Sequence, residues 1–250
     1  LTLAHHWLYQ GSGSFSHLGN SIASAGDVNG DGYDDVIVGD PLYSDDNITI
    51  ESRVHVFYGS ASGLSATPNW SAQSTSDGLL GWSVASAGDI NGDGYDDIIV
   101  GEPRFNNGQG DEGRFHIYLG SASGLSATPA HTIVGTTAGA QLGRSVASAG
   151  DVNGNGFDDV IVGAPFAGNG RAFLFLGSAG GLNTTPAWSV EGNTPNASLG
   201  YAVAAAGDVN NDGYGDVIVG GDGEAHIYHG SPSGLSTTAA WSVISDLESF

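Results

Sequence analysis

The chain is built from one phrase that is repeated four times. The phrase reads SIASAGDVNGDGYDDVIVG from Ser21 and returns with small changes from Ser83, Ser145 and Ala202. Its first aspartate falls at positions 27, 89, 151 and 208, so the spacings are 62, 62 and 57 residues. A second phrase, YGSASGLSATPNW in its first copy, follows each time and ends at Trp70, His131, Trp188 and Trp241. Repeats of this length predict one supersecondary unit that stacks on its own copies, without a boundary between unrelated domains.

Each unit is predicted to contain four short strands. In the first unit these are the small residues 21–25, the apolar run 35–38, residues 53–58 and the stretch around Trp70. Gly, Asn, Asp, Ser and Pro fill the intervals, as turns require, and helical periodicity is absent. Four-stranded units of this length are typical of propeller blades. We therefore predict an all-β propeller that forms a single domain over residues 1–250, with blades at approximately 15–76, 77–138, 139–195 and 196–250, and residues 1–14 as an extra outer strand.

The third strand of each unit carries bulky side chains on both faces. In the first unit Arg53, His55 and Phe57 share one face, and Val54 and Val56 share the other. This pattern predicts a sheet that is packed between two neighbours. His116 and His226 occupy the same repeat position as His55, and Phe173 fills it in the third unit. A residue that exchanges with Phe is predicted to serve packing rather than catalysis or metal binding.

The loop between the first two strands has the form Asp-x-Asn-x-Asp-Gly-x-x-Asp. Side-chain oxygens at positions 1, 3 and 5, a turn-forming Gly at 6 and a backbone carbonyl at 7 suit a calcium ion held by a flexible all-oxygen loop. The closing acid stands at position 9 and opens a strand, so the loop is a hairpin version of such a site. The candidate ligands are Asp27, Asn29, Asp31, the Tyr33 carbonyl and Asp35; Asp89, Asn91, Asp93, the Tyr95 carbonyl and Asp97; Asp151, Asn153, Asn155, the Phe157 carbonyl and Asp159; and Asp208, Asn210, Asp212, the Tyr214 carbonyl and Asp216.

Asn-Gly and Asp-Gly also form ordinary hairpin turns, which is the alternative interpretation of one such loop. Four loops in register, each with an acid at positions 1 and 9, favour calcium. Magnesium fits less well because it prefers smaller octahedral sites with several waters. We expect about four calcium ions per chain, which would change the formal net charge from −22 to −14. Asn155 replaces an aspartate at position 5, so the third loop is expected to bind more weakly.

Charge and cysteine content exclude several function classes. The chain has 5 basic residues, all of them arginine, against 27 acidic ones. Such a chain does not bind nucleic acid or an anionic membrane through a general basic field. The absence of cysteine excludes disulfides, thiolate zinc sites and cysteine nucleophiles. No apolar run reaches 18 residues, so no membrane-spanning helix is expected.

A second motif surrounds each acidic loop. In the third unit it runs from Leu142-Gly143 to Gly163-Ala164-Pro165. The other copies run from Leu18-Gly19 to Gly39-Asp40-Pro41, from Leu80-Gly81 to Gly101-Glu102-Pro103, and from Leu199-Gly200 to Gly220-Gly221-Asp222, where the Pro is lost. The sequence thus resembles the FG-GAP repeats of the integrin α-subunit propeller over nearly its whole length. The resemblance implies a propeller with calcium between the first two strands of each blade. It also implies a secreted or cell-surface protein, whose leader peptide is not part of this chain, in adhesion or ligand recognition.

The number of blades departs from that family, whose propellers usually have seven. The chain could be a fragment, a closed four-bladed ring, or half of an eight-bladed homodimer, and we favour the homodimer. Outer-strand equivalents occur at Trp7, Trp70, His131, Trp188 and Trp241, one more than the inner phrases. We expect the strand at Trp7 to act as a clasp on the last blade, in the same chain or in a partner.

The loops between the second and third strands differ most among the units. Variable loops on a constant scaffold are where recognition tends to reside, which makes Tyr43, Arg104 and Phe105 candidate contacts for an unknown protein or glycan ligand; the alternative is that they are solvated loops. A non-enzymatic recognition propeller is the favoured function. The alternatives are a lectin with pockets between blades, or a hydrolase or lyase acting on polysaccharide. We find no acid, base or nucleophile that stands apart from the repeat, so no catalytic residue is assigned.

Overall fold

The computed structural model describes residues 7–11, 16–43, 51–74, 76–194 and 196–245. These residues form four antiparallel sheets of four strands each, and they contain no helix that is long and apolar enough to cross a membrane. The first blade contains β1 (Ser21–Gly26), β2 (Asp35–Tyr43), β3 (Glu51–Phe57) and β4 (Trp70–Ser74). The second contains β5 (Val84–Gly88), β6 (Asp97–Glu102), β7 (Arg114–Tyr118) and β8 (His131–Val134). The third contains β9 (Ser145–Gly150), β10 (Asp159–Ala164), β11 (Arg171–Phe175) and β12 (Trp188–Glu191). The fourth contains β13 (Ala202–Gly207), β14 (Asp216–Gly221), β15 (Glu224–Tyr228) and β16 (Trp241–Ile244).

Within each blade the strands pair in chain order, so the predicted four-stranded propeller blade is confirmed. The acidic hairpin joins the first two strands, and each of these pairs contains a bulge next to its glycine, as between Ser24 and Gly26. In the first blade the ladder runs further than predicted. Asp40 pairs with Arg53 and, across a second irregularity, Tyr43 pairs with Glu51.

The hydrophobic core lies between blades. Three clusters of buried side chains each draw on two consecutive blades, and none is contained in one sheet. In the first cluster Ile37, Val54 and Val56 of the first blade meet Ile98 and Tyr118 of the second. The predicted packing of a sheet between two neighbours is confirmed for the second and third blades, whereas the first and fourth blades have one neighbour each.

Neighbouring blades approach each other closely at a pair of glycines. A Cβ atom added to Gly39 would lie 2.0 Å from the carbonyl oxygen of Gly81 in the next blade. The corresponding distances are 2.0 Å from Gly101 to the Gly143 oxygen and 1.9 Å from Gly163 to the Gly200 oxygen. Two backbones meet here, so no side-chain movement can relieve the contact.

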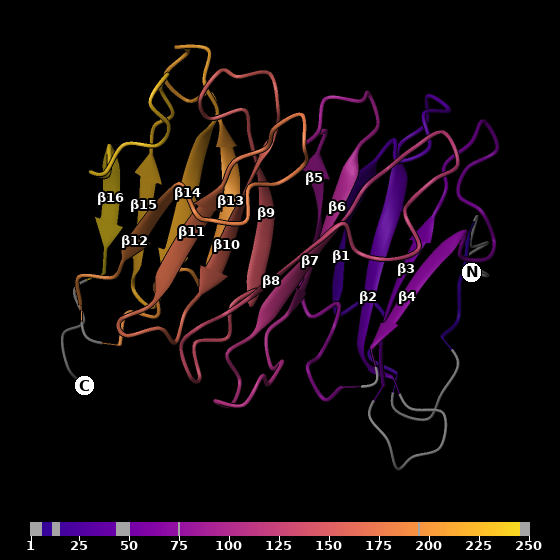
Figure 1. Cartoon of the computed structure of the whole chain (residues 1–250), viewed down its shortest axis with the longest axis horizontal. Helices are drawn as coiled ribbons and strands as arrows, with labels where there is room; N and C mark the ends of the chain where they lie inside the picture. The colour runs from indigo at the N-terminus through magenta and orange to yellow at the C-terminus, as the bar shows by residue number, and fades with distance from the viewer. Residues whose placement is uncertain (1–6, 12–15, 44–50, 75, 195, 246–250) are drawn as a thin grey trace, which may run out of the picture.

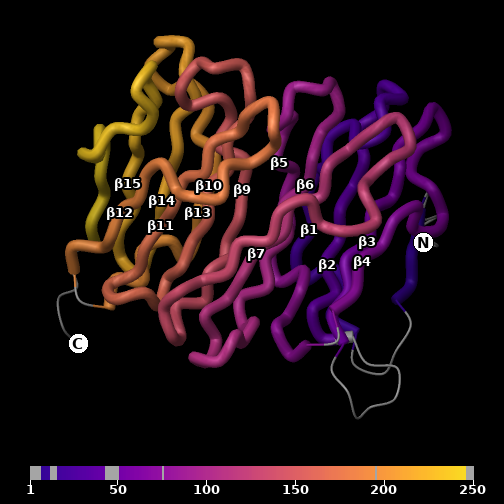
Figure 2. Tube along the Cα trace, in the orientation of Figure 1, coloured from indigo at the N-terminus to yellow at the C-terminus, as the bar shows by residue number. Residues whose placement is uncertain are grey.

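The four blades form an open row. Figures 1 and 2 show them side by side in chain order, with the N-terminus at one end and the C-terminus at the other. Contacts between strands of different blades follow that order, first with second, second with third and third with fourth. A closed four-bladed ring is therefore not what this chain adopts, because the first and fourth blades lie too far apart to pair.

The segment around Trp7 lies against the first blade and does not clasp the fourth blade of its own chain. The Trp7 indole N–H donates to the Ser65 carbonyl at 2.8 Å, and its ring packs edge-on against Phe57 with centroids 5.2 Å apart. Residues 7–11 form no strand, and the rest of the predicted outer strand lies outside the described residues.

Candidate metal centres and recognition surface

The first acidic loop folds around the side chain of its first aspartate. One carboxylate oxygen of Asp27 accepts the N–H groups of Gly30 and Asp31, and the other accepts that of Gly32. The side-chain oxygens of Asn29 and Asp31 accept the N–H groups two residues further on. Gly32 has φ of +88°, a left-handed conformation that favours glycine. The side-chain oxygens at positions 1, 3 and 5 are thus oriented by the backbone of their own loop.

The other three loops repeat this pattern. Asp89, Asp151 and Asp208 each accept N–H groups from positions 5 and 6 of their own loops. In the third loop the side-chain oxygen of Asn155 accepts the Phe157 N–H at 2.9 Å, as an aspartate does elsewhere. Asn155 therefore keeps the shape of the loop and removes one negative charge.

The position 9 acids are completely buried at the base of the loops. One oxygen of Asp35 accepts the Val28 N–H at 3.1 Å, and the other accepts the Gly59 N–H at the end of β3 at 2.8 Å. Asp97, Asp159 and Asp216 make the same two bonds in their blades. Burial and, to a smaller extent, the charges of Asp31 and Asp27 raise the pKa of Asp35 to about 6 despite these bonds. Burial and the acids of their own loops likewise raise the pKa values of Asp97 and Asp159 to about 7.

The donor chemistry of each loop fits a hard cation. Three carboxylate or amide side chains at positions 1, 3 and 5, the carbonyl at position 7 and the buried acid at position 9 offer oxygen ligands, which calcium prefers. Among the described residues, no three acidic or histidine side chains lie close enough together to form a metal cluster. The N–H bonds do not exclude a cation, because the Asp27 oxygen that accepts Gly32 N–H and the Asn29 and Asp31 oxygens that each accept one N–H retain a second lone pair. The raised pKa values reflect mainly burial and to a smaller extent the neighbouring acids, and a divalent ion would offset the negative charge of the ionised groups.

The eighth residue of the loop has a role that the sequence did not predict. The Asp96 carboxylate accepts the Asp27 N–H of the preceding blade at 2.8 Å, and Asp158 does the same for Asp89 at 3.0 Å. In the fourth blade Gly215 takes this position and has no carboxylate to offer. Consecutive acidic loops are therefore bonded to one another across the blade boundary. The sequence signal for this role is the recurrence of an aspartate at position 8 in the first three loops, at Asp34, Asp96 and Asp158.

The candidate ligand contacts lie at the opposite ends of the strands. The Tyr43 side chain is outside the described residues. Arg104 is exposed and lines a hollow of about 420 Å³ together with Asp77 and Asp111. Phe105 is half-buried, and its ring lies 3.5 Å below the Arg114 guanidinium. The structure thus places Arg104 at a polar surface and gives Phe105 a packing contact within its own blade.

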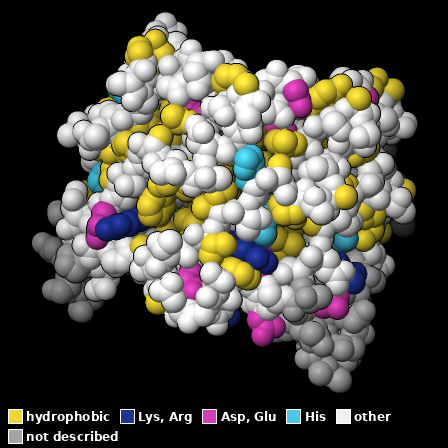
Figure 3. Space-filling model, in the orientation of Figure 1, with side chains coloured by type: hydrophobic (Ala, Val, Ile, Leu, Met, Phe, Trp, Pro, Cys, Tyr) yellow, Lys and Arg dark blue, Asp and Glu magenta, His cyan; other side chains and the backbone are white. Residues whose placement is uncertain are grey.

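A second hollow, of about 260 Å³, lies between β8 and the third blade. Its walls include Ile133, Leu142, Ala164 and Phe173, and Arg171 stands among them. The view in Figure 3 shows hydrophobic side chains in the furrows between blades and only scattered charged groups. The sequence did not single out this hollow. Small Ala164 lines it, at the repeat position that a large acid holds in the second blade.

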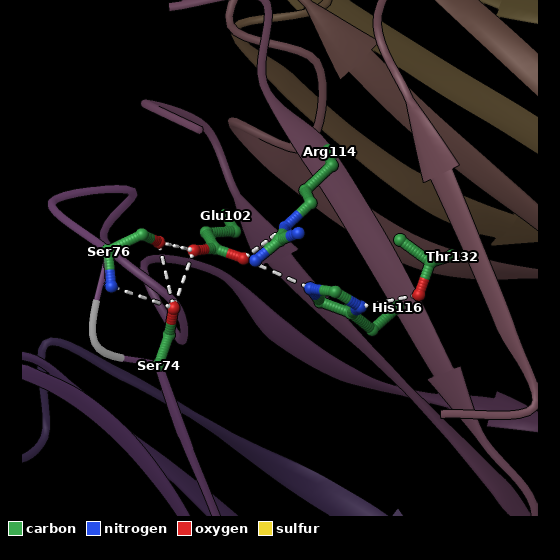
Figure 4. A network of polar contacts seen from close by, with 6 residues as sticks. All are labelled: Ser74, Ser76, Glu102, Arg114, His116 and Thr132. Carbon is green, nitrogen blue, oxygen red and sulfur yellow. Dashed lines mark hydrogen bonds and ion pairs between the residues drawn. The ribbon is translucent and has the colours of Figure 1, made fainter. Parts of the chain in front are cut away.

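That acid, Glu102, is fully buried within a network at the boundary of the first two blades (Figure 4). Its carboxylate accepts hydrogen bonds from Ser76 at 2.6 Å and Ser74 at 2.9 Å on one oxygen. Arg114 and His116 approach the other oxygen, with His116 Nε2 at 3.0 Å. Burial alone would raise the pKa of Glu102. The hydrogen bonds from His116, Arg114 and Ser76 outweigh it and hold that pKa at about 2.

This network predicts an acid-sensitive contribution to stability. A carboxyl group whose pKa is depressed in the folded state stabilises the protein at pH values above its ordinary pKa of 4.5. This contribution is lost as the pH falls towards 2. We expect Glu102→Gln to lower the free energy of unfolding by about 3 kcal/mol at pH 7 and by much less near pH 2. Urea melts across this pH range measure it. Glu191→Gln, which removes the exposed pair with Arg171, is the control and should cost less than about 1 kcal/mol. Equal losses in the two variants would contradict the assignment.

The histidines at the shared repeat position have structural partners, as predicted for packing residues. The Nδ1 atoms of His55, His116 and His226 lie 2.7, 2.9 and 2.7 Å from hydroxyl groups on the adjacent outer strands, those of Ser71, Thr132 and Ser242. All three rings are buried. Their Nδ1 atoms are therefore engaged by hydroxyl groups of their own blades.

Comparisons with known proteins agree on the repeat. A family model described as FG-GAP repeat matches residues 18–57, 80–118, 142–175 and 199–234. Integrin alpha-V of Gallus gallus is 34% identical over 232 residues, and integrin alpha-5 of Xenopus laevis is 32% identical over 236 residues. Each match covers 87% of this chain and 21% of the relative, so the chain spans about a fifth of their length.

Among solved structures, the crystal structure of the exotype rhamnogalacturonan lyase YesX aligns with a TM-score of 0.52 at 15% identity. The alignment covers 86% of this chain and 40% of the lyase. At this identity the likeness concerns the fold alone.

Proposed function

The chain belongs to the FG-GAP repeat family, and from this premise we propose that it is a non-enzymatic, calcium-stabilised propeller for adhesion or ligand recognition outside the cell. The observation that carries the proposal is the coincidence of four matched repeats with four all-oxygen loops of one geometry. The integrin α-subunits among its relatives support the extracellular and adhesive part.

Calcium would be structural in this proposal. It would be held by positions 1, 3, 5, 7 and 9 of each loop, about four ions per chain. Position 9 joins the loop to the end of the third strand, so an ion there would tie the hairpin to its sheet. Position 8 bonds to the preceding loop in the second and third blades, so the effect of an ion would extend across the boundary between blades.

Position 5 offers a matched pair of variants. We expect Asn155→Asp to tighten calcium binding by the third loop roughly tenfold, because it adds a negative charge to an unchanged loop shape, and affinity in such loops depends on ligand charge. Asp93→Asn should weaken the second loop by a similar factor. Calorimetric calcium titrations of both variants measure these changes. Identical isotherms for the variants and the parent chain would contradict the ligand assignment.

The adhesive role is tested with an immobilised panel of extracellular-matrix proteins and glycans. The 250-residue chain should bind at least one member in calcium and lose that binding in EDTA. Arg104→Ala should weaken binding if the loops between second and third strands contact the ligand. Arg144→Ala, on a different loop, is the control. Binding to no member of the panel would argue against recognition of these ligand classes.

The hollow beside Phe173 favours a second candidate, a lectin-like site between blades. An aromatic ring beside an arginine can pack against one face of a sugar and bond its hydroxyls. A glycan array distinguishes this candidate from the first. Glycan binding that Phe173→Ala abolishes and Arg104→Ala leaves intact would favour the lectin-like site.

A further inference from the structure

The two ends of the row carry matching halves of the contact that joins the blades inside it. Val28, Ile90 and Val152 face the next blade and are 0% exposed, whereas Val209 at the same repeat position in the fourth blade is 52% exposed. On the opposite face of each blade, Val84, Val146 and Val203 are 5–8% exposed, whereas Ile22 in the first blade is 69% exposed. The fourth blade therefore presents one half of the contact, and the first blade presents the other.

The backbone groups at these ends match as well. Inside the row a serine N–H at the end of the third strand donates to the carbonyl of the preceding loop: Ser121 to Val28, Ser178 to Ile90 and Ser231 to Val152, at 3.0–3.1 Å. The corresponding groups at the ends are the Ser60 N–H and the Val209 carbonyl. They lie at opposite ends of the row and cannot meet within one chain.

The tryptophans of the outer strands donate to one carbonyl position of the following blade, and at the first blade two tryptophans could occupy that position. Trp70 donates its indole N–H to the Ser126 carbonyl of the next blade, and Trp188 donates to that of Ser236, both at 3.0 Å. Trp241 is 49% exposed and faces no following blade. The acceptor equivalent to Ser126 on a first blade is the Ser65 carbonyl, which Trp7 occupies. Trp7 also packs on Phe57 as Trp70 packs on Tyr118.

We propose that the fourth blade binds the first blade of a second copy of this chain, head to tail, and that residues 7–11 compete with Trp241 for the same position. A second copy is the occupant because its first blade carries the partner for each exposed group: Ile22 for Val209, Ser60 for the Val209 carbonyl and Ser65 for Trp241. The contact between the two chains would have the same form as the three contacts between consecutive blades within one chain. This inference is independent of the proposed calcium and adhesion roles.

The competition is tested with the variant Trp7→Ala. Freeing the Ser65 carbonyl raises the fraction of chains that can accept Trp241, and apparent affinity rises with that fraction. We expect self-association at least about tenfold tighter than that of the parent chain, measured by sedimentation velocity in calcium. Adding Trp241→Ala to this variant should reverse the gain. Equal self-association of the Trp7→Ala variant and the parent chain would contradict the proposed competition. Absence of self-association in both would contradict the proposed interface.

The direction of the contact is tested by mixing, in the Trp7→Ala background. Ile22→Asp removes one half of the contact, and Val209→Asp removes the other. Because a head-to-tail contact uses two different surfaces, each variant alone should stay monomeric, and an equimolar mixture should form a one-to-one dimer. Near-identical circular dichroism and melting of the two variants establishes that both are folded. Self-association of either variant alone, or failure of the mixture to pair, would overturn the proposal.

Discussion

Removal of calcium is expected to lower the melting temperature by roughly 20 °C or more. A ligand that binds only the folded state stabilises it by about 2.7 kcal/mol per site at a concentration 100 times its dissociation constant. Four such sites amount to about 11 kcal/mol, which is comparable with the whole stability of an ordinary domain. At about 2 °C per kcal/mol for a chain of this size, the shift is large. Melts in millimolar calcium and in EDTA measure it directly.

The metal-free protein should also respond to pH in an unusual direction. Acids with raised folded-state pKa values stabilise the fold while protonated, and that contribution is lost as the pH rises through about 6 for Asp35 and about 7 for Asp97 and Asp159. In EDTA the melting temperature should therefore be higher at pH 5 than at pH 8. Calcium should remove this difference, because it replaces the proton as the compensating charge. If the melting temperature at pH 8 is the same in EDTA as in calcium, the loops are ordinary turns that bind no stabilising metal.

Gly163→Ala is expected to destabilise the protein by about 3 kcal/mol or more. The new methyl group would lie 1.9 Å from the Gly200 carbonyl oxygen and 2.9 Å from its carbon, both backbone atoms of the fourth blade. Overpacking a rigid contact costs typically 1–3 kcal/mol, and this contact cannot relax through a side chain. Separation of the third and fourth blades would in addition expose the cluster around Leu174, Trp188 and Val217. A urea melt of the variant in calcium gives the loss.

Gly220 provides the matched control, because it holds the same repeat position in the fourth blade. A methyl group there would meet its nearest heavy atom, Ala202 Cβ, at 3.8 Å, which is ordinary van der Waals contact. Gly220→Ala should change stability by less than about 0.5 kcal/mol. Equal losses at the two positions would mean that glycine is required by the strand itself and not by the neighbouring blade.

The sequence predicted the blade well because the blade is local. Turn residues at fixed offsets delimit the strands, and alternation along residues 53–58 indicated that both faces of the third strand are covered. The acidic loop was equally accessible, since the geometry around Asp27 involves only residues a few positions away. The equivalence of His55 with Phe173 identified the histidines as packing residues.

Relations between blades were not accessible in the same way. The bond from Asp96 to the Asp27 N–H, the contact between Gly163 and Gly200, and the position of Trp7 on Phe57 all join residues distant in the chain. A repeat supplies the same local signal at each copy, so it cannot show which copies touch or where the row ends. The hollow beside Phe173 has the same origin, because it depends on what a neighbouring blade leaves unfilled.

The strictly sequential order of blade contacts makes this chain quasi-one-dimensional in its energetics. When each unit touches only its neighbours, stability is approximately a sum of unit terms and boundary terms, and opening proceeds from an end. The fourth blade has a single boundary, an exposed outer strand β16 and no carboxylate at position 215 to bond back to the third loop. Its amides should therefore exchange with solvent first, while β6 and β10, buried between two neighbours, exchange last. Such a chain loses its blades in order, and the last to open is an interior one.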